Sequence, residues 1–446
     1  MAEIITPEII VAIMLGGVLV GVMIGYPLGL VIGSLGFAIG CMLWGVNLTF
    51  QLYYIRIFEI LLGYSFLAVP LFVFMGLMLE QSGIADILYD ALYLWFGRLP
   101  GGLAVTTILL GTVLAACVGV IGASVSMLAL VALPAMIKRG YSKDLACGTV
   151  AASGCLGILI PPSIMFIIYG PLAEISVGKL FMGAIFPGLL LAALYCLYIL
   201  TKCKLHPNLA PTLPTGETRI PLSTKLKKLV FGIIPTVLIV ASVLGTIFLG
   251  IAPPTEAGAM GGFATILLCA AYRKLTWKAL AETALGTFKI SSMILLIGCM
   301  SFAFVGVFLK ARGGGVVERI ILSTPGGEWG AFFAIMFVVF ILGFIIDWIA
   351  ILFIMAPILT PVVKAMGFDP LWFALMVCLN LQTSFMTPPF ASAIFYLKGC
   401  VKPEMGITMA DMFRGVIPFV ALILVGLLLS VAFPEILLWL PGKMIR

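Results

Sequence analysis

Uninterrupted apolar segments follow one another along nearly the whole chain and leave little sequence for a water-facing surface. Of all residues, 63% are hydrophobic and 10% are charged, whereas soluble domains are about half apolar and about a quarter charged. The segments have the length of about 20 residues that an α-helix needs to cross a hydrocarbon core of about 30 Å. The sequence therefore predicts an all-α polytopic membrane protein, because the alternating short strands of a membrane β-barrel are absent.

Ten full spans and two helical hairpins are predicted along the chain. Two segments, 101–137 and 330–363, carry small or polar residues near their centres. We expect them to be re-entrant hairpins, since irregular backbone at that depth must be covered by protein or line a wet cavity. Segments 84–97 and 314–323 have apolar residues at helical spacing and predict interfacial amphipathic helices. The full spans are expected at 7–25, 28–48, 57–80, 143–170, 179–201, 229–250, 254–272, 286–309, 370–397 and 413–434.

The two halves of the chain resemble each other in sequence. The segment "LPAMIKRGY" (133–141) matches "TPVVKAMGF" (360–368), and the pair Pro161–Pro162 recurs as Pro388–Pro389 at the same offset along the chain. Each half holds five full spans, an odd number, so the second half begins on the opposite face of the membrane. We therefore predict an inverted repeat of five spans plus one re-entrant hairpin per half, as in many secondary transporters. Shared needs of helix packing remain the alternative explanation.

The distribution of basic residues predicts the orientation of the chain in the membrane. Lysines and arginines crowd the hydrophilic linker 202–228, which the positive-inside rule assigns to the cytoplasm. With the predicted spans, this orientation leaves both termini on the periplasmic side. The basic residues lie in short loops between spans, so the net charge of +7 does not indicate nucleic acid binding. No basic segment precedes the first apolar run, and we interpret this run as a span instead of a cleaved signal.

The paired prolines interrupt two apolar spans at corresponding positions. Pro161 and Pro162 remove two backbone donors and clash with the preceding turn, so the span 143–170 should divide into two half-helices. Carbonyl groups freed at such a break suit a hard cation such as Na⁺, and the N-termini of half-helices favour an anion. Polar side chains accompany both breaks: Ser153 and Ser163 in the first half, and Asn380, Gln382, Thr383, Ser384 and Thr387 in the second.

The predicted hairpin tips hold further polar residues. The segment "GVIGASVSM" (119–127) places Ser124 and Ser126 between apolar arms, and "GFIIDWIAI" (343–351) places Asp347 there. A carboxylate deep in a membrane is costly and points to a cation partner, but Asp is also a frequent helix cap. For the two serines the alternative is close packing of small residues between helices. Glu256, which follows Pro253–Pro254, fits the acidic first turn of a helix better than a coupling site.

The arrangement predicts an elevator-type division into a scaffold and a transport domain. We assign the interfacial helices, hairpins and broken helices, at 84–178 and 313–400, to a transport domain that moves as one body. The expected scaffold comprises 1–80, 179–272 with the linker 202–228, 286–312 and 413–446. This division is inferred from the architecture.

Four motifs resemble the large membrane subunit of tripartite ATP-independent periplasmic (TRAP) transporters. They are "GASVSMLALVALPAMIKRGY" (122–141), "GILIPPSIMFIIYG" (157–170), "APILTPVVKAMGFDP" (356–370) and "NLQTSFMTPPFASAIFYLKG" (380–399). The resemblance covers nearly the whole chain. It implies Na⁺-driven import of organic acid anions across the bacterial inner membrane by an elevator mechanism. It also implies two partners besides the lipid bilayer: a periplasmic substrate-binding protein and a four-span small membrane subunit. No extra helices precede Ile5, so we expect the unfused form.

The same resemblance implies which residues form the site. The sodium sites of the family map to Gly122, Ser124, Ser153 and Gly157 in the first half and to Asp347, Thr383, Ser384 and Thr387 in the second. Candidate substrate contacts are Ser126, Ser163, Asn380 and Gln382. The stretch 381–399 is similar to the branch associated with 2-oxo acids, hydroxy acids, mannitol-like and chloroaromatic compounds, which defines the substrate class only loosely.

Other functional classes fit the same residues less well. An ion antiporter or a binding-protein-independent anion symporter would share the inverted-repeat scaffold, but antiporters tend to carry buried carboxylate pairs, which this sequence lacks. An intramembrane enzyme is disfavoured because the sole histidine, His206, lies in the linker and no metal-ligand spacing occurs. A purely structural subunit has no use for duplicated broken helices, which cost stability.

Overall fold

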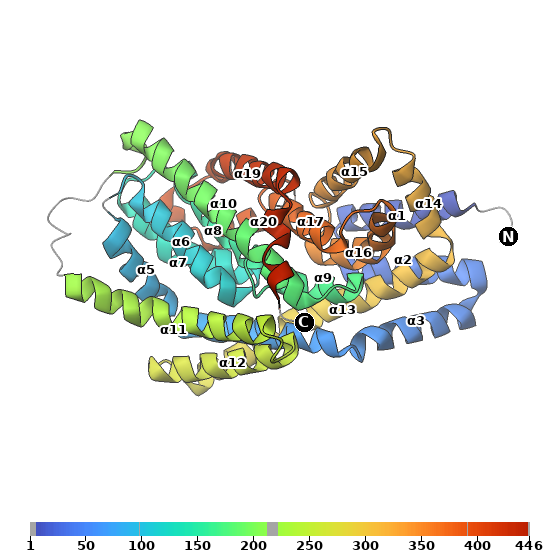
Figure 1. Ribbon diagram of the computed structural model, residues 1–446, viewed down its shortest axis with the longest axis horizontal. Helices are drawn as coiled ribbons and strands as arrows, with labels where there is room; N and C mark the ends of the chain where they lie inside the picture. Colours follow the sequence, from blue (N-terminus) through green and yellow to red (C-terminus); the bar gives the residue numbers. More distant parts are fainter. Residues whose placement is uncertain (1–5, 98, 212–221, 390, 445–446) are drawn as a thin grey trace.

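The structure is a computed structural model that describes residues 6–97, 99–211, 222–389 and 391–444, and every regular element in these ranges is a helix (Figure 1). The predicted all-α membrane class is thereby confirmed. Within these ranges, eight helices are long and apolar enough to cross a membrane, or up to ten if each of two bent helix pairs counts as one span. Predictions about both chain ends and about the linker at 212–221 fall outside the described residues.

The helices follow one order in each half of the chain. The first half contains α1 (Pro7–Ile24), α2 (Leu28–Trp44), α3 (Val46–Leu61), η1 (Tyr64–Leu67), α4 (Ala68–Gln81), α5 (Ile84–Phe96), α6 (Gly102–Val118), α7 (Ile121–Lys138), α8 (Lys143–Leu159), α9 (Ile164–Ala173), α10 (Val177–Leu205) and η2 (Pro207–Leu209). The second half contains α11 (Leu222–Phe248), α12 (Pro254–Ala271), α13 (Trp277–Lys310), α14 (Gly313–Leu322), α15 (Gly327–Leu342), α16 (Trp348–Ala365), α17 (Pro370–Ser384), α18 (Ser392–Cys400), η3 (Pro403–Met405), α19 (Met409–Ala432), α20 (Glu435–Leu438) and η4 (Pro441–Lys443).

Three predicted boundaries were wrong, each for a local reason. The span expected at 57–80 begins only at Tyr64, because α3 ends at Leu61 and the chain turns at Leu62 and Gly63. The span expected at 28–48 stops at Trp44, because Gly45, with a φ of +82°, turns the chain into a separate helix, α3. The sequence did not reveal α3 because polar residues interrupt its apolar pattern, among them the ion pair of Arg56 with Glu59. The span expected at 286–309 begins earlier, at Trp277, because Thr276 caps it by accepting a hydrogen bond from the N–H of Ala279 at 3.1 Å.

Both proline pairs interrupt their helices, as predicted. The axes of α8 and α9 differ by 40° across Pro161–Pro162, and α17 is separated from α18 by the segment that holds Pro388–Pro389. The peptide bond within each proline pair is cis. Each broken helix is preceded by a helix–turn–helix: α6 and α7 meet at residues 119–120, and α15 and α16 are joined by residues 343–347.

Corresponding helices of the two halves interlock. Helix α2 packs against α13, and its counterpart α12 packs against α4, which is the counterpart of α13. In the same way, α18 packs against α7, while its counterpart α9 packs against α16. These contacts between the halves therefore occur in pairs, as a two-fold internal repeat requires. Helices α3 and α4 together occupy the place that the single long helix α13 occupies in the second half.

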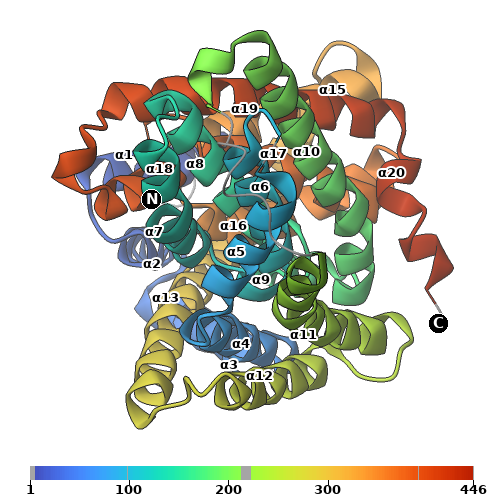
Figure 2. The same ribbon diagram turned by 90° about the vertical axis from the view of Figure 1, so that its left-hand side faces the viewer.

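The two broken helices form the centre of the molecule. Helix α8 is buried from Leu145 to Leu159, and α17 is buried from Trp372 to Ser384. Helices α3, α11 and α12 lie along one long side, opposite α10, α15 and α19 (Figure 1), and Figure 2 shows α16 and α17 behind α6 near the middle. Large apolar side chains on α11 and α12, such as Leu238 and Phe263, are exposed, as expected for helices that face lipid.

Two helices assigned to the scaffold pack against the broken helices. Helix α19 lies along α8 and α17, and α10 contacts α6, α9 and α17. Their packing favours grouping α10 and α19 with the hairpins and broken helices. The division into a scaffold and a transport domain stays a prediction.

The crossing of α8 and α19 gives a test of this packing. A Cβ atom at Gly148 would overlap the backbone of Gly415, and backbone cannot move aside as a flexible side chain can. Gly148→Ala should therefore destabilise the protein by about 1–3 kcal/mol, measured as a lower melting temperature of the purified protein in detergent. Gly16→Ala is the matched control, because a Cβ atom there meets nothing within 4 Å and alanine favours the helix. An equal loss in both variants would contradict the crossing.

Candidate functional site

Ser163 caps the first break from both sides. Its hydroxyl donates a hydrogen bond to the carbonyl of Ile158 near the end of α8, and it accepts one from the N–H of Met165 at 3.3 Å in the first turn of α9. One side chain thereby satisfies a carbonyl freed by the break and a donor at a helix N-terminus. Ser163, a predicted substrate contact, is fully buried and bonded to the backbone on both sides.

Two threonine hydroxyls form hydrogen bonds with backbone carbonyls at the second break. The hydroxyl of Thr383 donates to the carbonyl of Asn380 at 2.7 Å, and that of Thr387 donates to the carbonyl of Thr383 at 2.7 Å. The N–H of Ala393 reaches back to the carbonyl of Phe385 at 3.0 Å and so spans the break. A hydroxyl that donates its proton keeps its lone pairs, so both threonine oxygens can still face a cation.

A matching pair of hydrogen bonds ties each broken helix to the hairpin of its own half. The hydroxyl of Ser153 on α8 donates to the carbonyl of Thr107 on α6 at 2.6 Å. At the equivalent position of the second repeat, the amide of Asn380 on α17 donates to the carbonyl of Met336 on α15 at 2.7 Å. Hydrogen bonds between helices hold membrane proteins together where water is absent. Ser153 and Asn380 therefore position the hairpins, a role that the sequence did not reveal.

Several buried hydroxyls have no hydrogen-bond partner in the described part of the chain, and two of them, Ser124 and Ser384, lie where a hairpin meets a broken helix. Ser124 and Ser384 are both 3% exposed, and their Oγ atoms are unpaired. Ser124 faces Gly157, where a Cβ atom would lie 2.5 Å from the hydroxyl oxygen. Ser384 faces Gly343, where a Cβ atom would overlap the hydroxyl. An unpaired buried hydroxyl costs about 1–3 kcal/mol, so these oxygens point to a ligand.

A cavity of about 680 Å³ lies where the two hairpin tips meet the two breaks. Helix α13 closes one wall of the cavity with Ile290, Met293 and Ile294. The other walls are residues 119–122 at the first tip, Ile164 of α9, residues 347–349 at the second tip, and Pro389, Ser392, Phe395 and Tyr396 around the start of α18.

Four helix N-termini surround this cavity. The first turns of α7, α9, α16 and α18 all contribute wall residues. Backbone N–H groups at a helix N-terminus are unpaired within the helix and carry a partial positive charge, so they attract anions. Four such ends around one cavity create a strongly anion-favouring site without a basic side chain in its wall.

Asp347 combines both roles that the sequence left open. It is the N-cap residue of α16, and the backbone N–H groups of Trp348 and Ile349 lie near its carboxylate. It is also part of the cavity wall. A carboxylate at this place offers a charged ligand to a cation beside the bound anion.

The predicted site residues thus fall into separate groups. Gly122 and Asp347 are in the cavity wall, and a Cβ atom at Gly122 would lie 2.9 Å from Cζ of Tyr396. Gln382 is buried with an unpaired Nε2. Ser126 on α7 is partly buried and is not in the cavity wall.

Sequence reasoning missed several wall residues. The wall residues of α13 are apolar, so their sequence gives no sign of a binding site. Trp348 and Ser392 were not predicted as site residues, although they lie close to Asp347 and Pro389 in the sequence. Tyr396 had a signal, since it repeats Tyr169 at the offset that relates the two proline pairs. Tyr169 is buried whereas Tyr396 is 48% exposed, so the two halves use this position differently.

The comparison with known proteins decides the family. Residues 11–436 match the family described as "Tripartite ATP-independent periplasmic transporter, DctM component". The chain belongs to this family. It is therefore a large permease subunit of a TRAP transporter and a multi-pass membrane protein. Its relatives are transport permeases and not enzymes.

Two relatives and one solved structure illustrate the match. The C4-dicarboxylate TRAP transporter large permease protein DctM of Pseudomonas aeruginosa is 29% identical over 391 residues, which cover 87% of this chain and 88% of that protein. The isethionate TRAP transporter permease protein DctMQ of Oleidesulfovibrio alaskensis is 29% identical over 381 residues, which cover 85% of this chain but 58% of the relative. The YdaH transporter of Alcanivorax borkumensis shares the fold, with a TM-score of 0.64 at 14% identity over 94% of this chain and 99% of that one.

The geometry predicts which positions a thiol reagent can reach. In a variant of this permease without its ten native cysteines, Tyr396→Cys should react with a small polar methanethiosulfonate because Tyr396 is in the cavity wall and is 48% exposed. Asn380→Cys should stay unreacted, since this side chain is 3% exposed and packs against α15. The measurement is the fraction labelled by mass spectrometry. Equal labelling of both positions would contradict the placement of the cavity.

Proposed function

We propose that this permease couples Na⁺ entry to the import of a small organic acid anion. The carrying observation is that the buried hydroxyls of Ser124 and Ser384 are unpaired where a hairpin meets a broken helix, close in sequence to a cavity wall formed by four helix N-termini. The cation and the anion then neutralise each other in a place where either charge alone is costly. This mutual dependence is the physical basis of coupling.

Hard oxygen ligands at both junctions favour an alkali cation. Ser124 lies against the glycine at 157, and Ser384 lies against the glycine at 343, so each hydroxyl faces backbone that no side chain covers. The threonine oxygens at 383 and 387 and the carboxylate of Asp347 supply further oxygen atoms in the second half. Hydroxyl, carbonyl and carboxylate oxygens are the ligands that hard cations prefer.

The cavity supports a small organic anion as the cargo. Its volume of about 680 Å³ lies within the range of about 300–1,000 Å³ that is usual for small-molecule sites. The relatives are named for C4-dicarboxylates, isethionate, 2,3-diketo-L-gulonate and ectoine, all small and polar compounds. The cavity wall also has aromatic and apolar residues, among them Trp348 and Phe395. These residues can contact the carbon skeleton of an organic acid whose charged group lies at the helix N-termini.

A separate small subunit and a periplasmic binding protein complete the proposed assembly. The isethionate relative, of which this chain spans 58%, carries the joint designation DctMQ, which supports a second membrane component as a partner. In this proposal the complex resides in the bacterial inner membrane, with both termini of the large subunit in the periplasm. The binding protein delivers the anion from that side.

The contact between α13 and α16 supports an elevator movement. Phe353 of α16 packs against Gly298 of α13, where a Cβ atom would lie 2.6 Å from the ring. Within the described ranges, no hydrogen bond or ion pair joins these two helices. A smooth apolar contact can slide without breaking polar interactions, so α16 can move past α13 with the hairpin to which it belongs.

Removing one proposed ligand tests the cation coupling. Ser384→Ala should raise the Na⁺ concentration that gives half-maximal uptake by about five- to tenfold, because one ligand contributes about 1 kcal/mol. Asp347→Asn should act in the same direction. Uptake of the anion is measured in proteoliposomes that contain both membrane subunits and the binding protein, at a series of Na⁺ gradients.

The matched control for these variants is Ser430→Ala. Ser430 is equally buried, but its hydroxyl bonds to the carbonyl of Gly426 in its own helix at 2.9 Å. Its loss should leave the Na⁺ dependence unchanged. Uptake that ignores Na⁺ and follows a proton gradient would refute Na⁺ coupling.

A further inference from the structure

A second cavity, distinct from the transport site, lies between the arms of the second hairpin. It has a volume of about 370 Å³ and is lined by α1, α14, α15 and α16. Among its lining residues Thr324 alone is polar, and the hydroxyl of Thr324 bonds to the carbonyl of Ile320 in its own chain segment. A cavity without polar partners does not hold water and takes apolar ligands instead.

The first hairpin shows why the second one is open. Helices α6 and α7 pack directly against each other, whereas α15 packs against α14 and α17. Two positions of α7, Ser124 and Ala132, correspond at the repeat offset to Ile351 and Leu359 of α16. Both larger residues line the cavity. Small residues let helices approach closely, so bulkier residues in the second half leave a space that the first half lacks.

The cavity opens toward the bilayer. Ile320 of α14 and Val338 of α15 belong to its wall, yet they are 61% and 47% exposed. Both lie on helices of the second hairpin region, whose outer residues Phe333 and Phe337 are also exposed. In a membrane these apolar edges meet hydrocarbon, which can enter between them without crossing a polar barrier.

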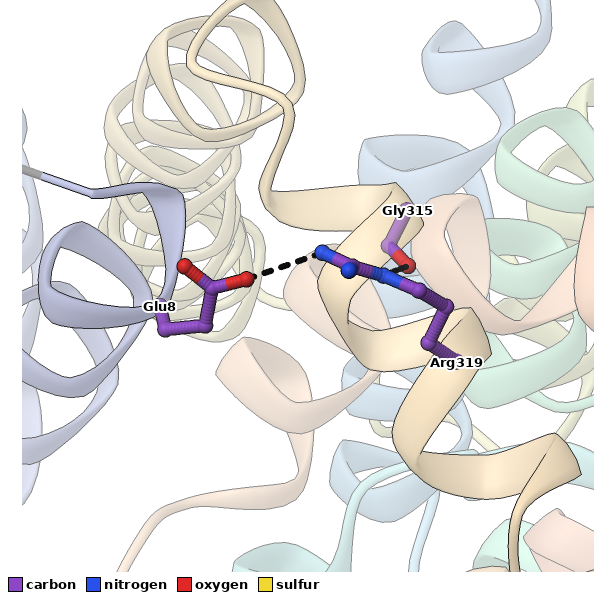
Figure 3. Close-up of polar contacts among 3 residues, drawn as sticks. All are labelled: Glu8, Gly315 and Arg319. Carbon is purple, nitrogen blue, oxygen red and sulfur yellow. Dashed lines mark hydrogen bonds and ion pairs between the residues drawn. The ribbon is translucent and has the colours of Figure 1, made fainter.

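An exposed ion pair joins two of the helices that line the cavity (Figure 3). Nη2 of Arg319 on α14 lies 2.9 Å from Oε1 of Glu8 on α1, and its Nε donates to the carbonyl of Gly315 at 3.4 Å. Both helices also supply cavity wall residues, such as Val11 and Val317. A guanidinium has five N–H donors, so the 71% exposed Arg319 side chain retains donors for a phosphate.

We propose that an acyl chain of a membrane phospholipid occupies this cavity, with the phosphate of the same lipid at Arg319. A water molecule takes up about 30 Å³, and a methylene group is of similar size, so 370 Å³ holds on the order of ten methylenes. The acyl chain is already in hydrocarbon before it enters the cavity, so van der Waals packing against the apolar wall and the phosphate contact at Arg319 hold it there. The lipid chain then fills the space between α15 and α16 up to Ile346, the neighbour of Asp347, and so supports the hairpin tip.

Photolabelling of the full-length protein tests the proposal. The probe is phosphatidylglycerol with a diazirine in the middle of one acyl chain, incorporated into lipid nanodiscs with the permease, and the adducts are mapped by peptide mass spectrometry. We expect adducts within 334–342 and 351–359. Ala334→Trp should reduce these adducts several-fold, because the indole ring takes the space that the acyl chain would occupy.

Two control variants separate the lipid from simple surface contact. Phe337→Trp changes an exposed residue of the same helix outside the cavity and should leave the adducts unchanged. Arg319→Gln should reduce them several-fold, whereas Glu8→Gln breaks the ion pair but keeps the guanidinium and should not. Adducts confined to the outer surface, or equally strong in Ala334→Trp, would overturn the proposal. Loss of the adducts when the small subunit is copurified would assign the cavity to a protein segment and would overturn it as well.

Discussion

Every polar backbone group inside a membrane must find a partner within the protein, and this constraint governs the centre of the permease. Two helices are interrupted where hydrocarbon would otherwise surround them, so the groups freed at each break have to be satisfied. Ser163 serves both sides of the first break, and Thr383 and Thr387 serve the second. Among the buried hydroxyls that have no partner in the described part of the chain, Ser124 and Ser384 lie where a hairpin meets a broken helix, and the proposed cation sites are placed there.

The interlocked repeat explains how two distant breaks share one site. Because α18 packs on the first hairpin and α9 on the second, the tip of each hairpin meets half-helices from both halves of the chain. The hydrogen bonds from Ser153 to Thr107 and from Asn380 to Met336 hold each hairpin to its own broken helix. The halves differ where Ser124 and Ala132 are replaced by Ile351 and Leu359, so the second hairpin leaves space that a lipid chain would fill.

The sequence predicted the features that depend on local rules. A proline pair inside an apolar run interrupts the helix, so both breaks were visible, and the repeat offset related one break to the other. Helix α3 was not predicted from the sequence, because Arg56 and Glu59 interrupt its apolar pattern. The convergence of four helix N-termini depends on how helices from the two halves pack, and no residue type signals this in the sequence. Ser153 and Asn380 were predicted as ligands because the sequence does not show which helices they face. In the fold, their side chains donate hydrogen bonds to the backbone of the hairpin arms.

The account depends on cations bound beside the two unpaired hydroxyls. An anomalous difference map from crystals in which Tl⁺ replaces Na⁺ tests this most directly. The account predicts one peak beside Oγ of Ser124 and one beside Oγ of Ser384, each within coordination distance of neighbouring backbone carbonyls. A map without a peak at either hydroxyl, or with peaks elsewhere in the protein, would contradict it.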